Sequence, residues 1–202
     1  MSSSGATKTS ANILSAASGS FSLSGSASVM VTNPPPPPLS IAFIISLEKG
    51  GDGEVIKLVA PAWGALLAEI ARDPDALLRM TPRQFEELVA AAHDADGADE
   101  VVLTPRSGDR GRDVIATYKG FGSVRILDQA KQFASDRPVP ADDVRALLGV
   151  LALDLNASKA VLTTTSHFAP GVADEFKAVV PYRLELVNGA QLTARLAELA
   201  KK

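Results

Sequence analysis

Apolar and polar residues follow two different periods along this chain, and the two periods predict helices and strands respectively. Between residues 82 and 95, Phe85, Leu88, Val89 and Ala92 are spaced as i, i+3, i+4 and i+7. That spacing places them on one face of an amphipathic helix. Short runs rich in Val and Ile, bounded by Gly, Pro or Asp, predict strands instead.

From residue 81 onwards the predicted elements alternate. In order, the pattern predicts a helix at 82–95, strands at 100–104, 112–118 and 123–131, a helix at 140–154, a strand at 159–164, a helix at 170–178, a strand at 182–187 and a helix at 189–200. Three consecutive strands followed by strand–helix alternation predict an α/β fold with a mixed central β-sheet flanked by helices.

The first 80 residues are predicted to form two further segments. Residues 1–38 are rich in Ser, Gly and Ala and end in five prolines, so they are predicted to be a disordered tail. The proline run is interpreted as a polyproline II spacer, with a binding motif for a protein partner as the alternative. Residues 39–80 are predicted to form a small segment of a β-hairpin and helices, with strands at 39–47 and 54–59 and a helix at 61–72.

Composition excludes several classes of protein. The chain has no cysteine, which excludes disulfide scaffolds, thiolate zinc sites and cysteine nucleophiles. The formal charge of −3 is unlike that of proteins that coat nucleic acid. The apolar run at 39–47 is too short to span a bilayer, and the start of the chain lacks the pattern of a secretory signal. These features predict a cytoplasmic protein with no membrane partner.

Polar residues at the ends of two predicted strands form the candidate site. Asp113 lies near the start of one strand, and Gln129 and Lys131 end the next. Because side chains alternate along a strand, Gln129 and Lys131 share a face, whereas Asp128 faces the opposite side. A metal ion and a phosphate would explain polar groups at the end of an apolar strand. A strand-edge aspartate and a solvated edge strand are the structural alternatives.

The predicted helix at 82–95 can add a carboxylate. On a helical wheel Glu86 borders the apolar stripe, whereas Glu87 points towards solvent, so Glu86 is the candidate and a solvated helix residue is the alternative. Oxygen atoms of Glu86, Asp113 and Gln129 suit Mg²⁺, and Lys131 would orient water or offset charge on a phosphate. Because Gln129 supplies only a neutral carbonyl oxygen, we expect the metal to be held less tightly than by three carboxylates.

From about residue 81 the chain resembles the Mrr-type restriction endonuclease domain, a branch of the PD-(D/E)xK nuclease superfamily. The segments that carry the resemblance are, in order, PRQFEELV, TPRSGDRGRDVIA, DQAK, VRALLGVL, KAVLTTTSHFAPG and LELVNGAQL. The resemblance implies a restriction-endonuclease-like domain at 81–202, Mg²⁺ as cofactor with Mn²⁺ as a substitute, and double-stranded DNA as substrate. It places the family's catalytic residues on Glu86, Asp113, Gln129 and Lys131, the first three as metal ligands.

Further residues extend the predicted site. Asp109 matches an acidic position that is frequent in the family. Ser166 is a predicted accessory residue that would cap a helix or touch a phosphate, because no Asp–His pair or nucleophile elbow supports a serine nucleophile. The predicted contacts to DNA phosphates are Arg110, Arg112, Lys119 and Arg145.

The sequence therefore predicts a Mg²⁺-dependent endonuclease that hydrolyses DNA phosphodiester bonds in restriction of foreign DNA. One alternative, motivated by Gln129, is a nuclease-fold protein that binds DNA or a partner with little or no cleavage. The other is a nuclease for DNA repair or junction resolution. A homodimer is compatible with each. Residues 39–80 are too few for the recognition domain of relatives that restrict modified DNA, so specificity for a modification is not predicted.

Overall fold

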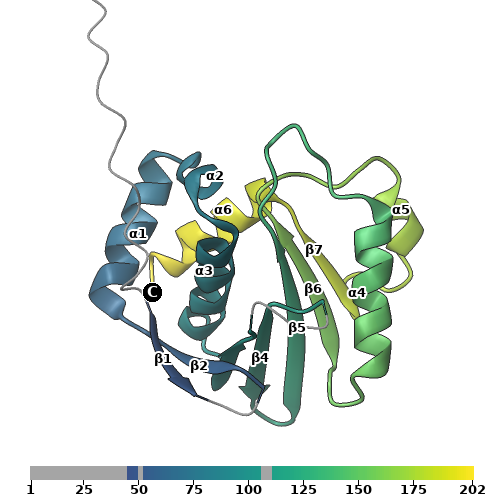
Figure 1. Cartoon of the computed structure of the whole chain (residues 1–202), viewed down its shortest axis with the longest axis horizontal. Helices are drawn as coiled ribbons and strands as arrows, with labels where there is room; N and C mark the ends of the chain where they lie inside the picture. The colour runs from purple at the N-terminus through teal and green to yellow at the C-terminus, as the bar shows by residue number, and fades with distance from the viewer. Residues whose placement is uncertain (1–44, 50–51, 106–110) are drawn as a thin grey trace, which may run out of the picture. The chain divides into compact units, whose positions relative to one another are not determined.

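Seven strands form one mixed β-sheet in the order β1-β2-β3-β4-β5-β6-β7 (Figure 1). The structure, a computed structural model, describes residues 45–49, 52–105 and 111–202. Neighbouring strands from β1 to β5 are antiparallel, whereas β5, β6 and β7 run parallel. The strands are β1 (Ile45–Lys49), β2 (Glu54–Leu58), β3 (Glu100–Leu103), β4 (Val114–Lys119), β5 (Ser123–Lys131), β6 (Lys159–Thr164) and β7 (Leu184–Val187).

Helices cover both faces of this sheet (Figure 1). The helices are α1 (Ala60–Arg72), α2 (Ala76–Arg79), α3 (Pro82–Ala95), α4 (Ala141–Leu153), α5 (Val172–Phe176) and α6 (Gly189–Leu199). Helices α1, α2, α3 and α6 pack against one face of the sheet in a single apolar cluster. Helices α4 and α5 pack against the opposite face in a second cluster. The predicted mixed α/β fold is confirmed.

Within the described ranges, no helix has the length and apolar character needed to cross a membrane.

Helix α3 begins where its sequence predicts. Thr81 Oγ1 accepts a hydrogen bond from the backbone N–H of Gln84 at 3.3 Å, and the Gln84 side chain accepts one from the Thr81 N–H at 2.8 Å. This capping box satisfies two backbone donors at the helix start, and Pro82 suits the first turn because it has no N–H to satisfy. The apolar stripe of the helix that begins here packs inward, and Phe85 and Leu88 are fully buried.

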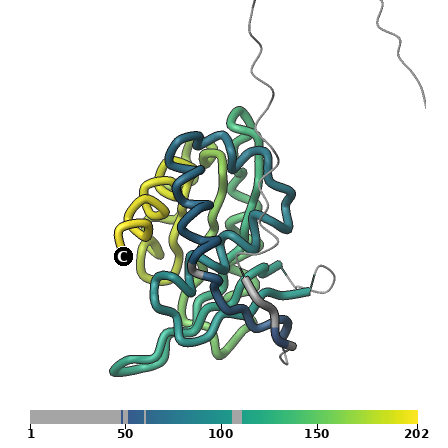
Figure 2. Tube along the Cα trace, turned by 90° about the vertical axis from the view of Figure 1, so that its left-hand side faces the viewer, coloured from purple at the N-terminus to yellow at the C-terminus, as the bar shows by residue number. Residues whose placement is uncertain are grey.

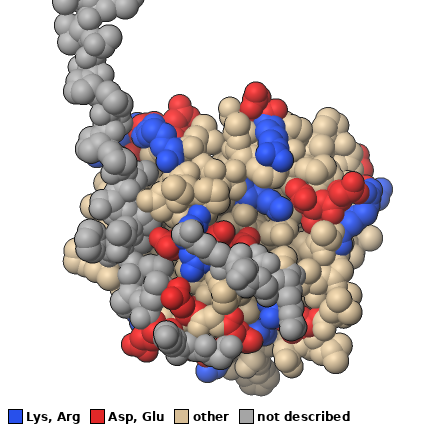
Figure 3. Space-filling model, viewed as in Figure 1, with Lys and Arg blue, Asp and Glu red and all other residues tan. Residues whose placement is uncertain are grey.

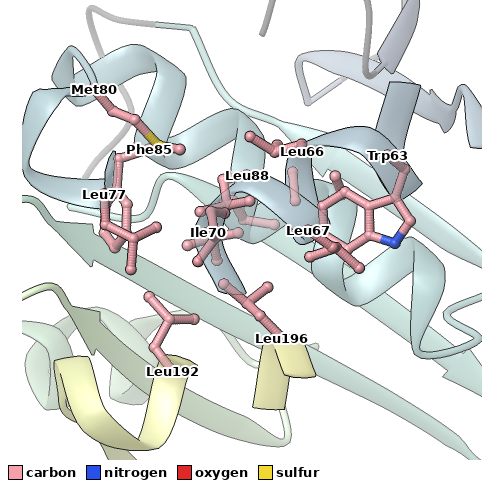
Figure 4. Packing of buried hydrophobic residues seen from close by; sticks show 14 of the residues in the cluster. Trp63, Leu66, Leu67, Ile70, Leu77, Met80, Phe85, Leu88, Leu192 and Leu196 are labelled. Atoms are coloured by element: carbon pink, nitrogen blue, oxygen red, sulfur yellow. The ribbon is translucent and has the colours of Figure 1, made fainter. Parts of the chain in front are cut away.

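The segment before α3 contributes to the same core. Figure 4 shows Ile70 of α1 beside Leu88 of α3, with Leu196 of α6 nearby, and Trp63 of the same cluster further along α1. Helix α1 also contacts α6, which lies more than a hundred residues further along the chain. The hydrophobic surface of α3 is therefore covered by elements from both ends of the described chain.

The start of β4 differs from its prediction. The strand begins at Val114 rather than at residue 112, and Gly111, just before it, adopts a left-handed backbone conformation with φ of 78°. Asp113 lies just before the strand, although its backbone still forms hydrogen bonds with Thr104 on one side and Asp128 on the other. Of the residues predicted as tail and first strand, 1–44 lie outside the described residues.

Truncating a core residue of α3 tests the burial of this helix. We expect Phe85→Ala to lower the free energy of unfolding by about 3–5 kcal/mol, since the ring is fully buried and its loss leaves a cavity. Phe121 is fully exposed at the projecting β4–β5 turn (Figure 2), so Phe121→Ala should change stability by less than about 0.5 kcal/mol. Urea unfolding followed by circular dichroism measures both. Equal effects of the two substitutions would contradict the packing described here.

Candidate active site

Asp113 is held at the end of the sheet by hydrogen bonds on both sides. Its backbone N–H donates to the carbonyl of Asp128 at 3.0 Å, and its own carbonyl accepts from the N–H of Thr104 at 2.9 Å. Its side-chain Oδ2 accepts a hydrogen bond from the backbone N–H of Ala130 at 2.8 Å. The Asp113 carboxylate is therefore held against β5 at Ala130, the residue between Gln129 and Lys131.

Gln129 lies opposite Asp113. The register of β4 and β5 pairs Val114 with Asp128, and one further step pairs Asp113 with Gln129 on the same face of the sheet. Gln129 Oε1 is buried and has no hydrogen-bond partner among the described residues. A buried carbonyl oxygen without a partner costs about 1–3 kcal/mol. A cation or a hydrogen-bond donor at this position would remove that cost.

Glu86 of α3 and Asp113 line the same pocket, which has a volume of about 360 Å³. Thr104, which follows β3, is part of the same wall. The side chain of Glu86 is 19% exposed, so it is neither solvated like a surface residue nor enclosed. The structure therefore brings the helix carboxylate and the strand carboxylate into one hollow at the end of the sheet.

Arg83 orients Glu86 and was not identified from the sequence. Its Nη1 donates to Glu86 Oε2 at 3.0 Å and to the Thr104 carbonyl at 2.9 Å, and its Nη2 lies 3.3 Å from Glu54 Oε2. Its Nε also lies 3.6 Å from Glu87 Oε1, and the Glu87 side chain is 19% exposed, as is that of Glu86. The prediction that Glu87 faces solvent is wrong, because its side chain lies beside Arg83 and is mostly buried. The i,i+3 spacing of Arg83 and Glu86 was the available signal.

Lys131 ends β5 two residues beyond Gln129, so both side chains are on the face that α4 covers. Its Nζ lies 3.8 Å from Oδ1 of Asp143, which is in the first turn of α4, and both side chains are about a quarter exposed. Asp143 was not predicted as part of the site. An acidic residue in the first turn of a helix is explained by the helix dipole alone, so the sequence contained no distinguishing signal.

The donor atoms fit a hard divalent cation with a partly neutral ligand set. Within the described ranges, no three His, Asp or Glu side chains are grouped so that they could hold a metal ion. The set at this end of the sheet instead combines two carboxylates, Glu86 and Asp113, with the unpartnered carbonyl oxygen of Gln129. Carboxylate and amide oxygens are the protein ligands of Mg²⁺. A site with one neutral ligand attracts the cation less strongly than a site with three charged ones.

Two of the predicted DNA contacts form ion pairs within the protein. Arg112 Nη1 lies 2.6 Å from Oδ2 of Asp154 just after α4, and both side chains are mostly buried. Arg145, on α4, pairs with Asp142 and Glu175 on the surface. Figure 3 shows basic and acidic side chains interspersed on the face that Figure 1 presents. To bind a DNA phosphate, either arginine would have to break its ion pair with the neighbouring carboxylate or keep that ion pair while also contacting the phosphate.

The remaining predicted residues are further from the pocket or outside the described ranges. Lys119 ends β4 at the strand end opposite Asp113, which corresponds to a separation of roughly 20 Å along the strand. Ser166 is buried, and its hydroxyl donates to the carbonyl of Arg137 at 2.6 Å. Asp109 and Arg110 lie outside the described residues.

Comparison with known proteins identifies the family. The model of the Mrr catalytic domain, described as a restriction endonuclease, matches residues 77–196, which is more than half of the chain. No curated protein gives a significant match.

Two solved structures are similar in part. MspJI restriction endonuclease in complex with a 27-mer oligonucleotide aligns with a TM-score of 0.45 and 21% identity, covering 72% of this chain and 37% of that one. The DNA modification-dependent restriction endonuclease AspBHI aligns with a TM-score of 0.49 and 21% identity, covering 67% and 35% respectively. The chain thus spans little more than a third of the length of either enzyme. On the family match over residues 77–196, this chain belongs to the Mrr-type restriction endonuclease domain family.

Proposed function

We propose that this protein is a Mg²⁺-dependent DNA endonuclease that acts in restriction of foreign DNA in the cytoplasm. Membership of a restriction endonuclease family supports DNA cleavage as the chemistry. The observation that carries the proposed site is the position of Asp113, which is fixed by Ala130, shares a pocket with Glu86 and lies opposite the unpartnered oxygen of Gln129.

Three residues would hold the metal. Asp113 and Glu86 supply carboxylate oxygens, and Gln129 supplies the buried carbonyl oxygen that has no other partner among the described residues. Mg²⁺, or Mn²⁺ in its place, supplies Lewis acidity and activates a water molecule when bound. The hydrogen bond from the Ala130 N–H keeps one Asp113 oxygen in a fixed orientation, which reduces the rearrangement needed on binding.

Lys131 would act on the phosphate. On the same face as Gln129, its ammonium group can stabilise the negative charge that develops on the phosphate oxygens during hydrolysis. Oδ1 of Asp143 lies 3.8 Å from the Lys131 ammonium and provides a weak counter-charge. A contact of that length between partly exposed groups is readily exchanged for a phosphate.

Arg83 would keep Glu86 in position for this reaction. It joins Glu54, Glu86 and the carbonyl of Thr104 through one guanidinium group that is only 14% exposed. A rigid planar donor of this kind fixes the rotamer of its carboxylate partner better than a lysine can. Arg83 is therefore proposed as a positioning residue rather than a catalytic one.

Contacts with the DNA backbone are proposed for Arg110, Arg112, Lys119 and Arg145. Arg112 and Arg145 would exchange Asp154 and Glu175 for phosphate, so each contact is weakened by the ion pair that it replaces. The resulting binding should depend strongly on salt concentration, because phosphate contacts release counterions.

A protein that binds DNA but cleaves it slowly is the second candidate. The observation in its favour is that the described residues contain no group of three His, Asp or Glu side chains that could hold a metal ion. Weak metal binding would then limit cleavage at physiological Mg²⁺ without affecting contacts to the DNA backbone.

Cleavage of plasmid DNA in Mg²⁺ tests the catalytic residues. We expect Glu86→Gln, Asp113→Asn and Lys131→Met each to lower the rate by at least about 10²-fold, since each removes a ligand or a charge that stabilises the transition state. Glu198→Gln, which changes an exposed carboxylate on α6, should stay within about twofold of wild type.

A gel-shift assay checks that the variants still bind DNA. Cleavage that survives both Asp113→Asn and Lys131→Met refutes the site, and binding without cleavage in the wild type supports the second candidate.

The dependence on Mg²⁺ tests Gln129 separately from catalysis. We expect Gln129→Glu to lower the Mg²⁺ concentration at half-maximal thermal stabilisation by about tenfold or more, because a third carboxylate strengthens the site. Gln129→Ala should abolish the stabilisation. Without Mg²⁺, Gln129→Glu should melt below wild type, because it adds a negative charge near Asp113. Identical Mg²⁺ titrations for wild type and Gln129→Glu would show that this residue does not contact the metal.

Stability and metal dependence together test Arg83. Arg83→Met should lower the free energy of unfolding by about 1–3 kcal/mol, since it leaves the Thr104 carbonyl and Glu86 without a donor. Arg79→Met, which removes a half-exposed pair with Asp73, should cost less than about 1 kcal/mol. Arg83→Met should also raise the Mg²⁺ concentration needed for cleavage, with partial recovery in Arg83→Lys. An unchanged Mg²⁺ requirement would leave Arg83 with a structural role alone.

A further inference from the structure

A second pocket lies on the opposite face of the sheet from Gln129 and Lys131. It has a volume of about 760 Å³, which is in the range of small-molecule sites. Its walls come from α3, α6 and strands β4 to β7, and α3 and α6 contact each other on this face (Figure 1). The apolar side chains that line it include Val89, Ala92, Ile126, Val161, Leu192 and Leu196.

Four polar residues form a chain of hydrogen bonds on this face. Tyr118 Oη lies 2.9 Å from Nδ1 of His93, and Nε2 of His93 lies 3.1 Å from Oδ2 of Asp128. Thr163 Oγ1 donates to the same Asp128 oxygen at 3.0 Å. Burial raises the pKa of Tyr118, with Asp96 and Asp128 adding to the effect, so the phenol stays protonated.

Asp128 is the unsatisfied member of this group. It is 2% exposed, and both of its hydrogen-bond donors go to Oδ2. Its other oxygen, Oδ1, is buried and has no partner among the described residues. The residue was predicted from the sequence to face away from Gln129, and the structure confirms this.

The other carboxylates that line the pocket are already neutralised. Asp96 pairs with Lys202 at 2.7 Å, and Glu198 pairs with Lys201 at 2.7 Å. Glu185 pairs with both Lys159 and Arg195. Among the described residues Asp128 has no lysine or arginine partner; its Oδ2 lies 3.1 Å from Nε2 of His93, and its Oδ1 has no partner at all.

We propose that this pocket binds a small organic cation, with an apolar body against α3, α6 and the sheet and a protonated amine directed at Asp128 Oδ1. The ammonium group supplies the donor that Oδ1 lacks, in a charge-assisted hydrogen bond. The volume and the apolar walls accommodate an aromatic or branched aliphatic group. Glu86 and His93 are two turns apart on α3, so this pocket is separate from the proposed nuclease site, and the inference does not depend on it.

A series of three probes with one apolar body tests the proposal. They are 2-phenylethylamine, 2-phenylethanol and 3-phenylpropanoate, titrated into the full chain and followed by ¹H–¹⁵N NMR. We expect the amine to bind at least about tenfold more tightly than the alcohol, equivalent to about 1.4 kcal/mol, and the anion not to bind. The shifted amides should be those of α3, α6 and β5 around the pocket. Equal binding of amine and alcohol, shifts confined to other surfaces, or no binding of the amine at about 10 mM overturns the proposal.

Variants separate the pocket from the nuclease site. Asp128→Asn should reduce the preference for the amine to less than about twofold, whereas Glu198→Gln, a paired carboxylate of the same wall, should leave the preference unchanged. Asp113→Asn should also leave it unchanged, so that loss of amine binding in this variant would place the cation at the nuclease site and refute the inference.

Ala194→Trp, at an exposed position of α6 that lines the pocket, should block all binding without disturbing the core. If Asp128→Asn does not fold, the preference in wild type and the block by Ala194→Trp decide the question.

Discussion

Hydrogen bonds between β4 and β5 set the positions of the polar groups on both sides of the sheet. The pairing of Val114 with Asp128 brings Asp113 opposite Gln129, and the bond from the Ala130 N–H fixes the Asp113 carboxylate there. A shift of one residue in this register would exchange the two faces of β5. Gln129 would then face α3 and Asp128 would face α4, and neither polar group would meet its present neighbours.

Strand β5 therefore serves two chemically different environments. Gln129 and Lys131 face α4, while Asp128 faces α3 and α6 among apolar side chains. Helix α3 links the two, because Glu86 is near its start and His93 near its end. The apolar stripe of this helix holds it against the sheet, and the polar residues on the border of the stripe reach the two pockets.

Much of the secondary structure follows from local signals. The capping pair Thr81 and Gln84 and the spacing of Phe85 and Leu88 define α3 at its observed bounds, and the apolar run of β5 is equally clear. The start of β4 was predicted two residues too early, because the local sequence does not show that pairing with both β3 and β5 begins at Val114. Glu87 was assigned to solvent because only its position relative to the apolar stripe was considered, whereas Arg83, four residues earlier on the same helix, is held near it by contacts with Glu54 and the Thr104 carbonyl.

The sequence by itself determined the family, the α/β pattern and the candidate residues Asp113, Gln129 and Lys131 at the end of the sheet. These features depend on periodicity and on motifs that are local in the chain. Only the tertiary structure decided which of those groups have partners. Arg112 and Arg145 turned out to be paired, whereas single oxygen atoms of Gln129 and Asp128 were left without a donor among the described residues. Such differences arise from contacts between residues far apart in sequence, where burial removes the water that would otherwise satisfy each group.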